Sequence, residues 1–287
     1  MSTPSTATTK QRVRLLGYPV GHSLSPLMHG AAFTALGIDA EYALWETHPT
    51  QLAAHVAALR DAPYLGANLT IPHKEQVLPL LDEVSPLALR AGAVNTIVKR
   101  GATLRGENTD IGGFLWPLRA GGAEFKRWRV TLLGAGGAAR GVAVALLDAG
   151  VSRLTIANRS IERARALAAA LDDERIEVLQ LGERWVGGAL SRSDLVVNAT
   201  AAGWRPEDPP LLAPELLQRL PDHALVYDLT YRRTPLLRAA EERGLATIDG
   251  LPMLVEQGAL AFQFWTGREA PRPIMWAAAQ AGRDGRA

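Results

Sequence analysis

The 287-residue chain contains no cysteine, which excludes disulfides, thiolate metal sites and cysteine nucleophiles. The absence of disulfides fits a reducing compartment, and we expect a cytoplasmic protein. No apolar run reaches the roughly 18 residues that a membrane-spanning helix needs, so we expect no membrane association. The formal net charge is only +2, which gives no strong basic field for nucleic acid. The apolar fraction of 47% and the charged fraction of 21% are ordinary for a globular protein.

Both ends of the chain are small and polar. The first residues, MSTPSTATTK, lack the apolar core of a secretory signal, and we predict a short frayed leader there. The last residues, AGRDGRA, predict a frayed tail. His22, His29 and His73 are not spaced with a carboxylate cluster as metal ligands are, so we predict no metal site.

Apolar strands and amphipathic helices alternate twice along the chain, and the length suits two domains. The first series includes a predicted helix over PLMHGAAFTALG, another over HKEQVLPLLDEV, and a hairpin from AVNTIVKR and ATLRGENT. The second series predicts six strands, RVTLLGA, RLTIANR, IEVLQLG, DLVVNAT, ALVYDLT and LATIDG, in a doubly wound parallel sheet. A helix around 111–128 bridges the two series, and Pro117 is expected to kink or shorten it.

We therefore predict an α/β protein with an N-terminal α/β substrate domain and a doubly wound Rossmann-like domain. The substrate domain spans 1–110 and is completed by C-terminal helices over 251–287. The dinucleotide domain spans 111–250.

A glycine turn follows the first strand of the second series. Gly134, Gly136 and Gly137 lie between an apolar strand and an apolar helix, and Ala139 takes the last small position of G-x-G-x-x-G/A. Such a turn lets a pyrophosphate approach the backbone at a helix N-terminus. A glycine-rich turn without a ligand is the alternative, but the flanking strand and helix favour dinucleotide binding.

The residues at the end of the next strand determine which of the two nicotinamide dinucleotides, NAD or NADP, binds. NAD sites typically place a carboxylate there for the ribose 2′-hydroxyl, whereas this chain has Asn158, Arg159 and Ser160, with Arg163 one turn on. Arginine binds a 2′-phosphate by donating charge-assisted hydrogen bonds to its oxygens. These residues favour NADP over NAD. The alternative is that Asn158–Ser160 form a polar turn without a ligand and that Arg163 is a solvated helix residue.

Polar residues stand at loop positions of the first series. Ser23 and Ser25 are two apart, which on an extended backbone puts both hydroxyls on one side, and Ser25 before Pro26 is also a typical helix N-cap. The other such residues are Thr70, Lys74, Asn95 and Asp110. Taken alone, Lys74 is most simply an exposed surface lysine and Asp110 an N-cap.

Together these stretches resemble the shikimate dehydrogenase family. The matching segments, in family order, are GYPVGHSLSPLMH, GANLTIPHKE, AGAVNTI, GENTDIGGF, LLGAGGAARGV, ANRSIERA, VVNAT, YDLTY and GLPMLVEQGALAFQFWTG. The resemblance implies NADP-dependent reversible reduction of 3-dehydroshikimate to shikimate, a step of chorismate and aromatic amino acid biosynthesis. It also implies an active site in the cleft between the domains.

The resemblance also implies a role for each matching residue. Lys74 would be the acid/base with Asp110 beside it. Substrate hydroxyls and carboxylate would contact Ser23, Ser25, Thr70, Asn95, Asp110, Tyr231 and Gln257. The cofactor would contact Gly134, Ala135, Gly136, Gly137, Ala138, Asn158, Arg159, Ser160, Arg163, Leu229 and Gly250.

Two alternatives stay open. One is a quinate/shikimate dehydrogenase of broader specificity, perhaps with NAD, although Ser25 and Arg159 stand where such relatives often carry threonine and aspartate. The other is a non-catalytic NADP-binding regulator on the same scaffold, although Lys74 and Asp110 are both present. The sequence leaves open whether the chain is a monomer or a homodimer, and whether Lys74 is charged at rest.

Overall fold

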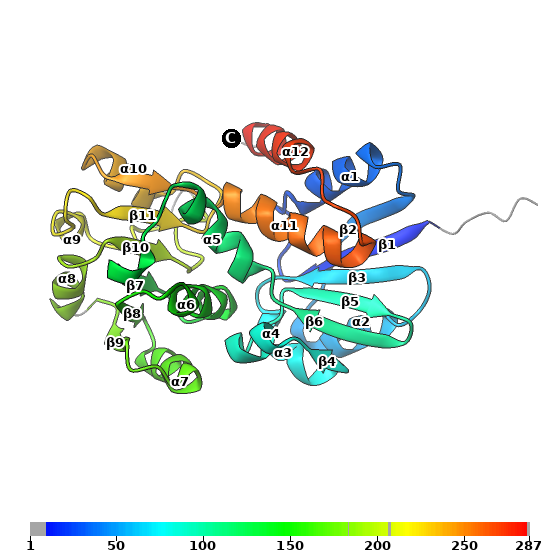
Figure 1. Cartoon of the computed structure of the whole chain (residues 1–287), viewed down its shortest axis with the longest axis horizontal. Coiled ribbons are helices and arrows are strands. Elements are labelled where there is room, and N and C mark those ends of the chain that lie inside the picture. Colours follow the sequence, from blue (N-terminus) through cyan, green and yellow to red (C-terminus); the bar gives the residue numbers. More distant parts are fainter. Residues whose placement is uncertain (1–9, 183, 206–207, 286–287) are drawn as a thin grey trace, which may run out of the picture.

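The computed structural model describes residues 10–182, 184–205 and 208–285, and within these ranges it forms two lobes, each around a six-stranded sheet (Figure 1). The predicted leader falls almost entirely on residues 1–9, outside the described residues. The prediction of a frayed tail is wrong for residues 281–284, because helix α12 (Arg272–Asp284) includes them. Residues 286–287 lie outside the described part.

The first lobe contains a mixed sheet with the strand order β2-β1-β3-β5-β6-β4. Its strands are β1 (Gln11–Gly17), β2 (Ala40–Glu46), β3 (Tyr64–Leu69), β4 (Glu83–Val84), β5 (Thr96–Arg100) and β6 (Thr103–Glu107). Strands β1, β2 and β3 run parallel, and β5 and β6 form the predicted antiparallel hairpin. Its helices are α1 (Ser25–Ala35), α2 (Leu52–Ala58), α3 (His73–Gln76) and α4 (Pro86–Ala91).

The long helix predicted over HKEQVLPLLDEV is wrong. Helix α3 stops after one turn at Gln76, a 3-10 turn follows over Leu78–Leu80, and the segment ends in the short strand β4. Pro79 explains the break, since a proline has no N–H to donate and its ring clashes with the preceding turn. Helix α4, which was not predicted, begins after Ser85, whose side chain accepts the Ala88 N–H.

The second lobe contains all six predicted strands. They are β7 (Arg129–Leu133), β8 (Arg153–Asn158), β9 (Ile176–Gln180), β10 (Leu195–Asn198), β11 (Leu225–Asp228) and β12 (Ala246–Ile248). Every neighbouring pair is parallel, and the order is β12-β11-β10-β7-β8-β9. The chain order thus reverses between β7 and β10, which is where doubly wound sheets bind ligands at their carboxyl ends.

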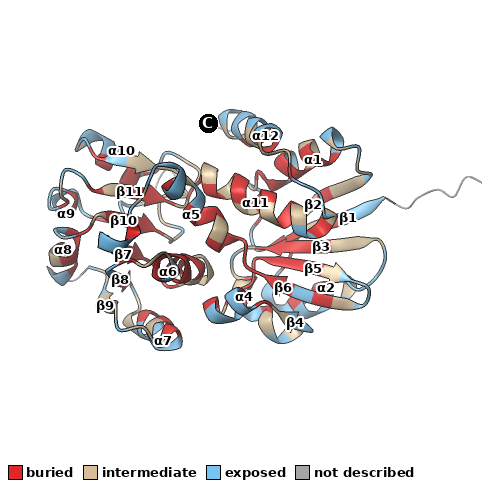
Figure 2. Ribbon diagram, viewed as in Figure 1, coloured by how far each residue is buried: buried red, intermediate tan, exposed pale blue. Residues whose placement is uncertain are grey.

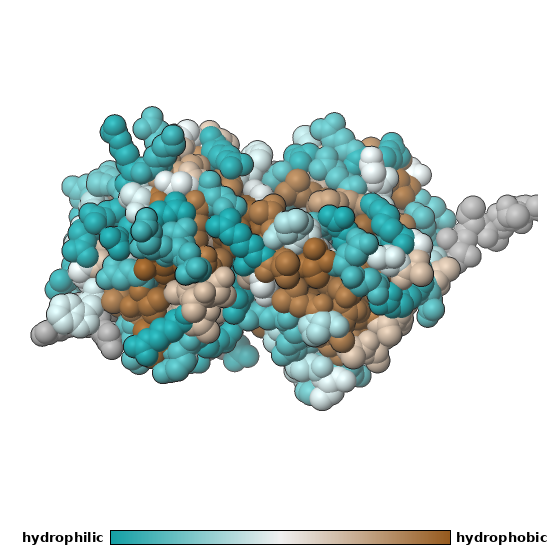
Figure 3. All heavy atoms as spheres, turned by 60° about the horizontal axis from the view of Figure 1, so that its bottom comes forward, coloured by the Kyte–Doolittle hydropathy of each residue, from teal (hydrophilic) through white to brown (hydrophobic). Residues whose placement is uncertain are grey.

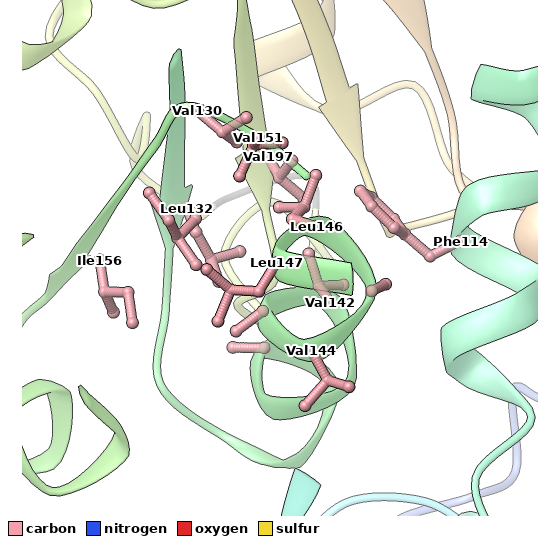
Figure 4. Packing of buried hydrophobic residues seen from close by; sticks show 14 of the residues in the cluster. Phe114, Val130, Leu132, Val142, Val144, Leu146, Leu147, Val151, Ile156 and Val197 are labelled. Carbon is pink, nitrogen blue, oxygen red and sulfur yellow. The ribbon is translucent and has the colours of Figure 1, made fainter. Parts of the chain in front are cut away.

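Helices cover both faces of this parallel sheet. They are α6 (Gly137–Ala149), α7 (Ile161–Leu171), α8 (Arg184–Leu190), α9 (Pro214–Leu217) and α10 (Pro235–Glu242). Figure 4 shows Val142, Leu146 and Leu147 of α6 packed among strand residues such as Val130 and Leu132. Figure 2 shows buried strands beneath helices whose outward faces are exposed, as expected for a sheet covered on both sides.

Two helices pass between the lobes. Helix α5 (Asp110–Ala120) follows β6, and helix α11 (Leu251–Thr266) follows β12. They pack tightly because Gly113 has no side chain: a Cβ there would lie 2.8 Å from Gln257 Cβ. Helix α5 ends three residues after Pro117, as the predicted shortening requires. Helices α11 and α12 also pack on the first sheet, where Phe262 and Met275 share a core with Val13 and Leu15.

His29 lies in this core without a hydrogen-bond partner among the described residues. Its ring is completely buried and stacks on Tyr42, with ring centroids 4.5 Å apart. Burial lowers the pKa of His29 from 6.5 to about 3, because desolvation disfavours the charged ring. The folded protein therefore keeps His29 neutral at pH values where the unfolded chain would protonate it.

This burial predicts an acid-sensitive stability. Since the folded pKa of His29 is depressed, the unfolded state binds the extra proton as the pH falls below about 6.5, and stability decreases. We expect His29 to account for a loss of about 2 kcal/mol in the free energy of unfolding between about pH 7 and about pH 5. Urea unfolding of a His29→Phe variant at both pH values measures it. The variant should lack this part of the pH dependence, whereas a control variant of the exposed His48, His48→Gln, should keep it. An equal pH dependence in His29→Phe and wild type would contradict the prediction.

Candidate functional site

A buried polar cluster joins helices α3, α5 and α11. Lys74 Nζ donates to Asp110 Oδ2 at 2.7 Å, and the two side chains are 13% and 5% exposed. Asn95 Nδ2 lies 2.8 Å from Asp110 Oδ1 and 3.3 Å from Gln257 Oε1. The structure thus brings together four predicted site residues that are up to 183 positions apart (74 to 257) in the sequence.

Backbone contacts fix these side chains. The Val94 N–H donates to the Lys74 carbonyl at 2.8 Å, which ties the short helix α3 to the segment before β5. The Thr109 N–H donates to Asn95 Oδ1 at 2.8 Å and so holds the start of α5. Asp110 is the first residue of α5 and Thr109 is its N-cap, so the N-cap interpretation of Asp110 is wrong. The Asp110 carboxylate instead accepts hydrogen bonds from Lys74 and Asn95.

The serine pair lies at the start of α1. Leu24 between them has helical backbone angles, so the expected extended spacing is wrong. Ser25 is the first helical residue rather than the N-cap, and its N–H donates to Ser23 Oγ at 3.2 Å. Ser25 is buried near the Tyr42 hydroxyl, which donates to Asn68 Oδ1 at 2.8 Å. Asn68 in turn donates to the Asn95 carbonyl at 3.1 Å, so a chain of polar contacts links the serines to the cluster.

Thr70 and Tyr231 follow strands of two different sheets. Thr70 follows β3, and its N–H donates to the Leu16 carbonyl at 2.9 Å. Tyr231 follows β11, and its hydroxyl donates to the His22 carbonyl at 3.1 Å, a contact between the lobes. The loop that carries Tyr231 is held by buried Asp228, which accepts from Asn198 Nδ2 at 3.0 Å and from Thr234 Oγ1 at 2.8 Å. Burial raises the pKa of Asp228 despite these hydrogen bonds.

A cavity of about 690 Å³ lies against the glycine turn. We call it the glycine-turn cavity, and its lining includes residues from both lobes, which are separated by a notch in Figure 3. Gly134 has φ +116°, and a Cβ there would lie 3.1 Å from Thr200 Cγ2, so only glycine fits. Gly136 is the N-cap of α6 and has no side chain to accept the first N–H groups of the helix. Those groups are therefore available to an anion in the cavity.

The end of β8 forms another part of the wall. Asn158, Arg159 and Arg163 line the glycine-turn cavity, and both arginines are exposed. Ser160 does not line it; its hydroxyl caps α7 by accepting the Arg163 N–H at 3.4 Å. Leu229 and Gly250 also lie outside the lining and contact each other, since a Cβ on Gly250 would lie 2.0 Å from the Leu229 carbonyl oxygen. The cavity therefore contains most of the predicted cofactor residues, with these three placed elsewhere.

The polar cluster and the glycine-turn cavity meet at Lys74. A Cβ on Gly137 would lie 2.8 Å from Lys74 Cβ, so the lysine stem passes over the glycine turn. Sequence reasoning missed several lining residues, namely Ile71, Pro72, Glu75, Leu181, Ala199–Ala202 and Asp208–Leu211. The position of Glu75 next to Lys74 was the signal that could have identified it. Ile71 and Pro72 lie in the family-matching segment GANLTIPHKE, and Ala199 and Thr200 lie in VVNAT, so these segments were a further signal. The remaining lining residues are loop residues without a distinctive motif.

No three His, Asp or Glu side chains within residues 10–182, 184–205 and 208–285 are grouped so as to hold a metal ion. Within the same ranges no helix has the length and apolar character needed to cross a membrane.

Family models match three segments of the chain. The model described as shikimate dehydrogenase substrate binding domain matches residues 15–97. The model described as shikimate/quinate 5-dehydrogenase matches residues 119–233, and the shikimate 5′-dehydrogenase C-terminal domain matches residues 250–280. These segments include most of each lobe, helix α11 and most of helix α12.

Individual relatives resemble the chain over nearly its whole length. A shikimate dehydrogenase (NADP(+)) of Symbiobacterium thermophilum is 48% identical over 279 residues, which is 94% of each chain. The structure of shikimate 5-dehydrogenase from Thermus thermophilus in complex with NADP(H) and shikimate is 41% identical, with a TM-score of 0.84 over 95% of this chain and 99% of that one. A quinate dehydrogenase from Corynebacterium glutamicum in complex with NAD is 32% identical, with a TM-score of 0.84 over 95% of this chain and 99% of that one.

Proposed function

This chain belongs to the shikimate dehydrogenase family, and from that premise we propose that it catalyses the NADP-dependent, reversible reduction of 3-dehydroshikimate to shikimate. The reaction is a step of chorismate and aromatic amino acid biosynthesis. The observation that carries the proposal is the position of Lys74, which is paired with Asp110 and lies directly over the glycine turn. A proton donor thus stands beside the place where a dinucleotide fits.

The glycine-turn cavity fits NADP. The open backbone at Gly134–Ala138 and the start of helix α6 suit the pyrophosphate. Asn158, Arg159 and Arg163 suit the 2′-phosphate, because guanidinium groups form charge-assisted hydrogen bonds with phosphate oxygens. We further propose that Ser160 contacts the phosphate in addition to capping α7. Leu229 and Gly250, at the ends of β11 and β12, are proposed to contact the nicotinamide end.

The chemistry divides between cofactor and protein. NADPH supplies the hydride that the carbonyl carbon of 3-dehydroshikimate accepts. Lys74 donates a proton from Nζ to the carbonyl oxygen, where negative charge develops, and in the reverse direction neutral Lys74 takes the proton from the hydroxyl. Asp110 orients Nζ through the 2.7 Å hydrogen bond, and Asn95 fixes the other oxygen of that carboxylate.

The remaining polar residues are proposed to hold the substrate. Thr70, Asn95, Asp110 and Gln257 would contact the ring hydroxyls, and Ser23, Ser25 and Tyr231 would contact the carboxylate. The contact of Tyr231 with His22, next to Ser23, supports this grouping. Such contacts would hold the substrate carbonyl in a fixed orientation toward Lys74, which lowers the entropic cost of reaching the transition state.

The domain boundaries and cellular setting are also proposals. We propose a substrate domain over 1–110 completed by 251–287, and an NADP domain over 111–250, because the first sheet shares its core with α11 and α12. We propose a cytoplasmic enzyme, since the chain has no cysteine, which fits a reducing compartment. It would act as a monomer or homodimer, which light scattering distinguishes.

An absorbance assay tests the function directly. We expect NADPH to form from shikimate and NADP⁺ between about pH 7 and 10, with kcat/KM at least about tenfold higher for NADP⁺ than for NAD⁺, and higher for shikimate than for quinate. No detectable rate with any of the four combinations would instead support a non-catalytic regulator. A preference for quinate with NAD⁺ would contradict the substrate and cofactor assignments together.

A further inference from the structure

An acidic side chain lies in the glycine-turn cavity, opposite the arginines. Glu75 belongs to helix α3 of the first lobe and lines the cavity beside Lys74. Its Oε2 accepts from Arg140 Nε at 2.9 Å, and its Oε1 lies 3.5 Å from an Arg163 nitrogen. Arg140 is on α6 and Arg163 on α7, so one carboxylate of the first lobe binds two helices of the second.

The two arginines differ in how firmly they hold Glu75. The Arg140 side chain is 17% exposed and forms a hydrogen bond, whereas Arg163 is 61% exposed and only within ion-pair distance. A solvent-exposed ion pair at such a distance contributes little and is readily exchanged for a stronger partner. Arg163 is therefore the partner that Glu75 gives up more easily.

The 2′-phosphate is such a partner, since it carries more charge than a carboxylate and accepts several hydrogen bonds. Resting on the proposed function, we propose that Glu75 tunes the cofactor preference by competing with the 2′-phosphate for Arg163, while Arg140 retains the carboxylate. NAD lacks this phosphate and leaves the Glu75–Arg163 pair undisturbed. Glu75 thus weakens NADP binding selectively and narrows the difference in affinity between the two cofactors.

The test measures the ratio Kd(NAD)/Kd(NADP) by titration without substrate, in wild type and in Glu75→Gln. The amide keeps the shape of the side chain and removes its charge. We expect the ratio to rise by about 3- to 5-fold, through tighter binding of NADP alone, since exposed ion pairs contribute at most about 1 kcal/mol. The rise should shrink at high ionic strength, because exposed charges are screened.

A matched control is available in the Arg90–Asp148 pair. This ion pair also joins the two lobes, from α4 to α6, but neither residue lines the glycine-turn cavity. Asp148→Asn removes one negative charge and one contact between the lobes, and it should leave the ratio within about twofold of wild type.

A double variant assigns the effect to Arg163. In an Arg163→Gln background, Glu75→Gln should change the ratio by less than about twofold, since the group for which it competes is gone. An unchanged or lower ratio in Glu75→Gln alone would overturn the proposal, and so would an undiminished rise in the Arg163→Gln background. Failure of the wild-type protein to bind NADP would overturn the proposed function itself, and this inference with it.

Discussion

Replacing Lys74 with alanine is expected to lower kcat by about 10²- to 10⁴-fold, while the Kd for NADP stays within about threefold of wild type. The loss follows from the role of Nζ: without it, no positioned group donates the proton to the carbonyl oxygen as charge develops there. Asp110 remains, but its carboxylate then faces the site without its 2.7 Å partner and cannot donate. The measurement is steady-state turnover together with a separate cofactor titration.

Two further variants separate this chemical role from packing. The Lys74 stem passes over Gly137, so alanine also removes contacts at the glycine turn. Lys74→Met keeps most of that stem and lacks only the ammonium group, so it should lose as much turnover as Lys74→Ala. Lys126, an exposed lysine near the start of β7, is the control, and Lys126→Ala should behave as wild type. Turnover of Lys74→Met within a few-fold of wild type would rule out the acid/base assignment.

The sequence alone could predict the second lobe almost completely. Its strands are parallel and buried, so each appears as a short apolar run, and glycine turns and helices separate them. The glycine turn at Gly134 was recognisable for the same reason, since a strand before it and a helix after it give the motif its meaning. The first lobe was harder to predict, because Pro79 broke an apparently regular helical pattern into α3, a 3-10 turn and β4.

The contacts of the candidate site could not be predicted from local pattern. Asn95 and Gln257 are 162 residues apart, and they meet because α5 and α11 approach closely at Gly113. The resemblance to a family named both residues, but no periodicity placed them together. The contact between Glu75 and Arg140 is less predictable still, since it depends on how one lobe sits against the other.

The largest effect on cofactor affinity is expected from removing two arginines, Arg159 just after β8 and Arg163 on α7. In a variant that combines Arg159→Gln and Arg163→Gln, the Kd for NADP should rise by at least about 100-fold, because hydrogen bonds from charged groups contribute about 1.5 to 3 kcal/mol each. The Kd for NAD should change by less than about threefold, because NAD has no 2′-phosphate and so makes no such contacts with the two arginines. Titration with each cofactor measures both values. Arg165, which is exposed on α7 with Arg163 but lies outside the cavity lining, provides the control variant Arg165→Gln.

The pair of values distinguishes recognition of the 2′-phosphate from a general loss of positive charge. A general loss of positive charge would weaken the binding of NADP and NAD alike, through the pyrophosphate that both share, and would contradict the assignment of Arg159 and Arg163.

Under that assignment the double variant leaves Glu75 in the cavity with Arg140 as its remaining partner. Glu75 then has no Arg163 guanidinium for which to compete, so adding Glu75→Gln to the double variant should change Kd(NAD)/Kd(NADP) by less than about twofold. A large recovery of NADP affinity in that triple variant would mean that Glu75 repels the phosphate directly, which contradicts competition for Arg163.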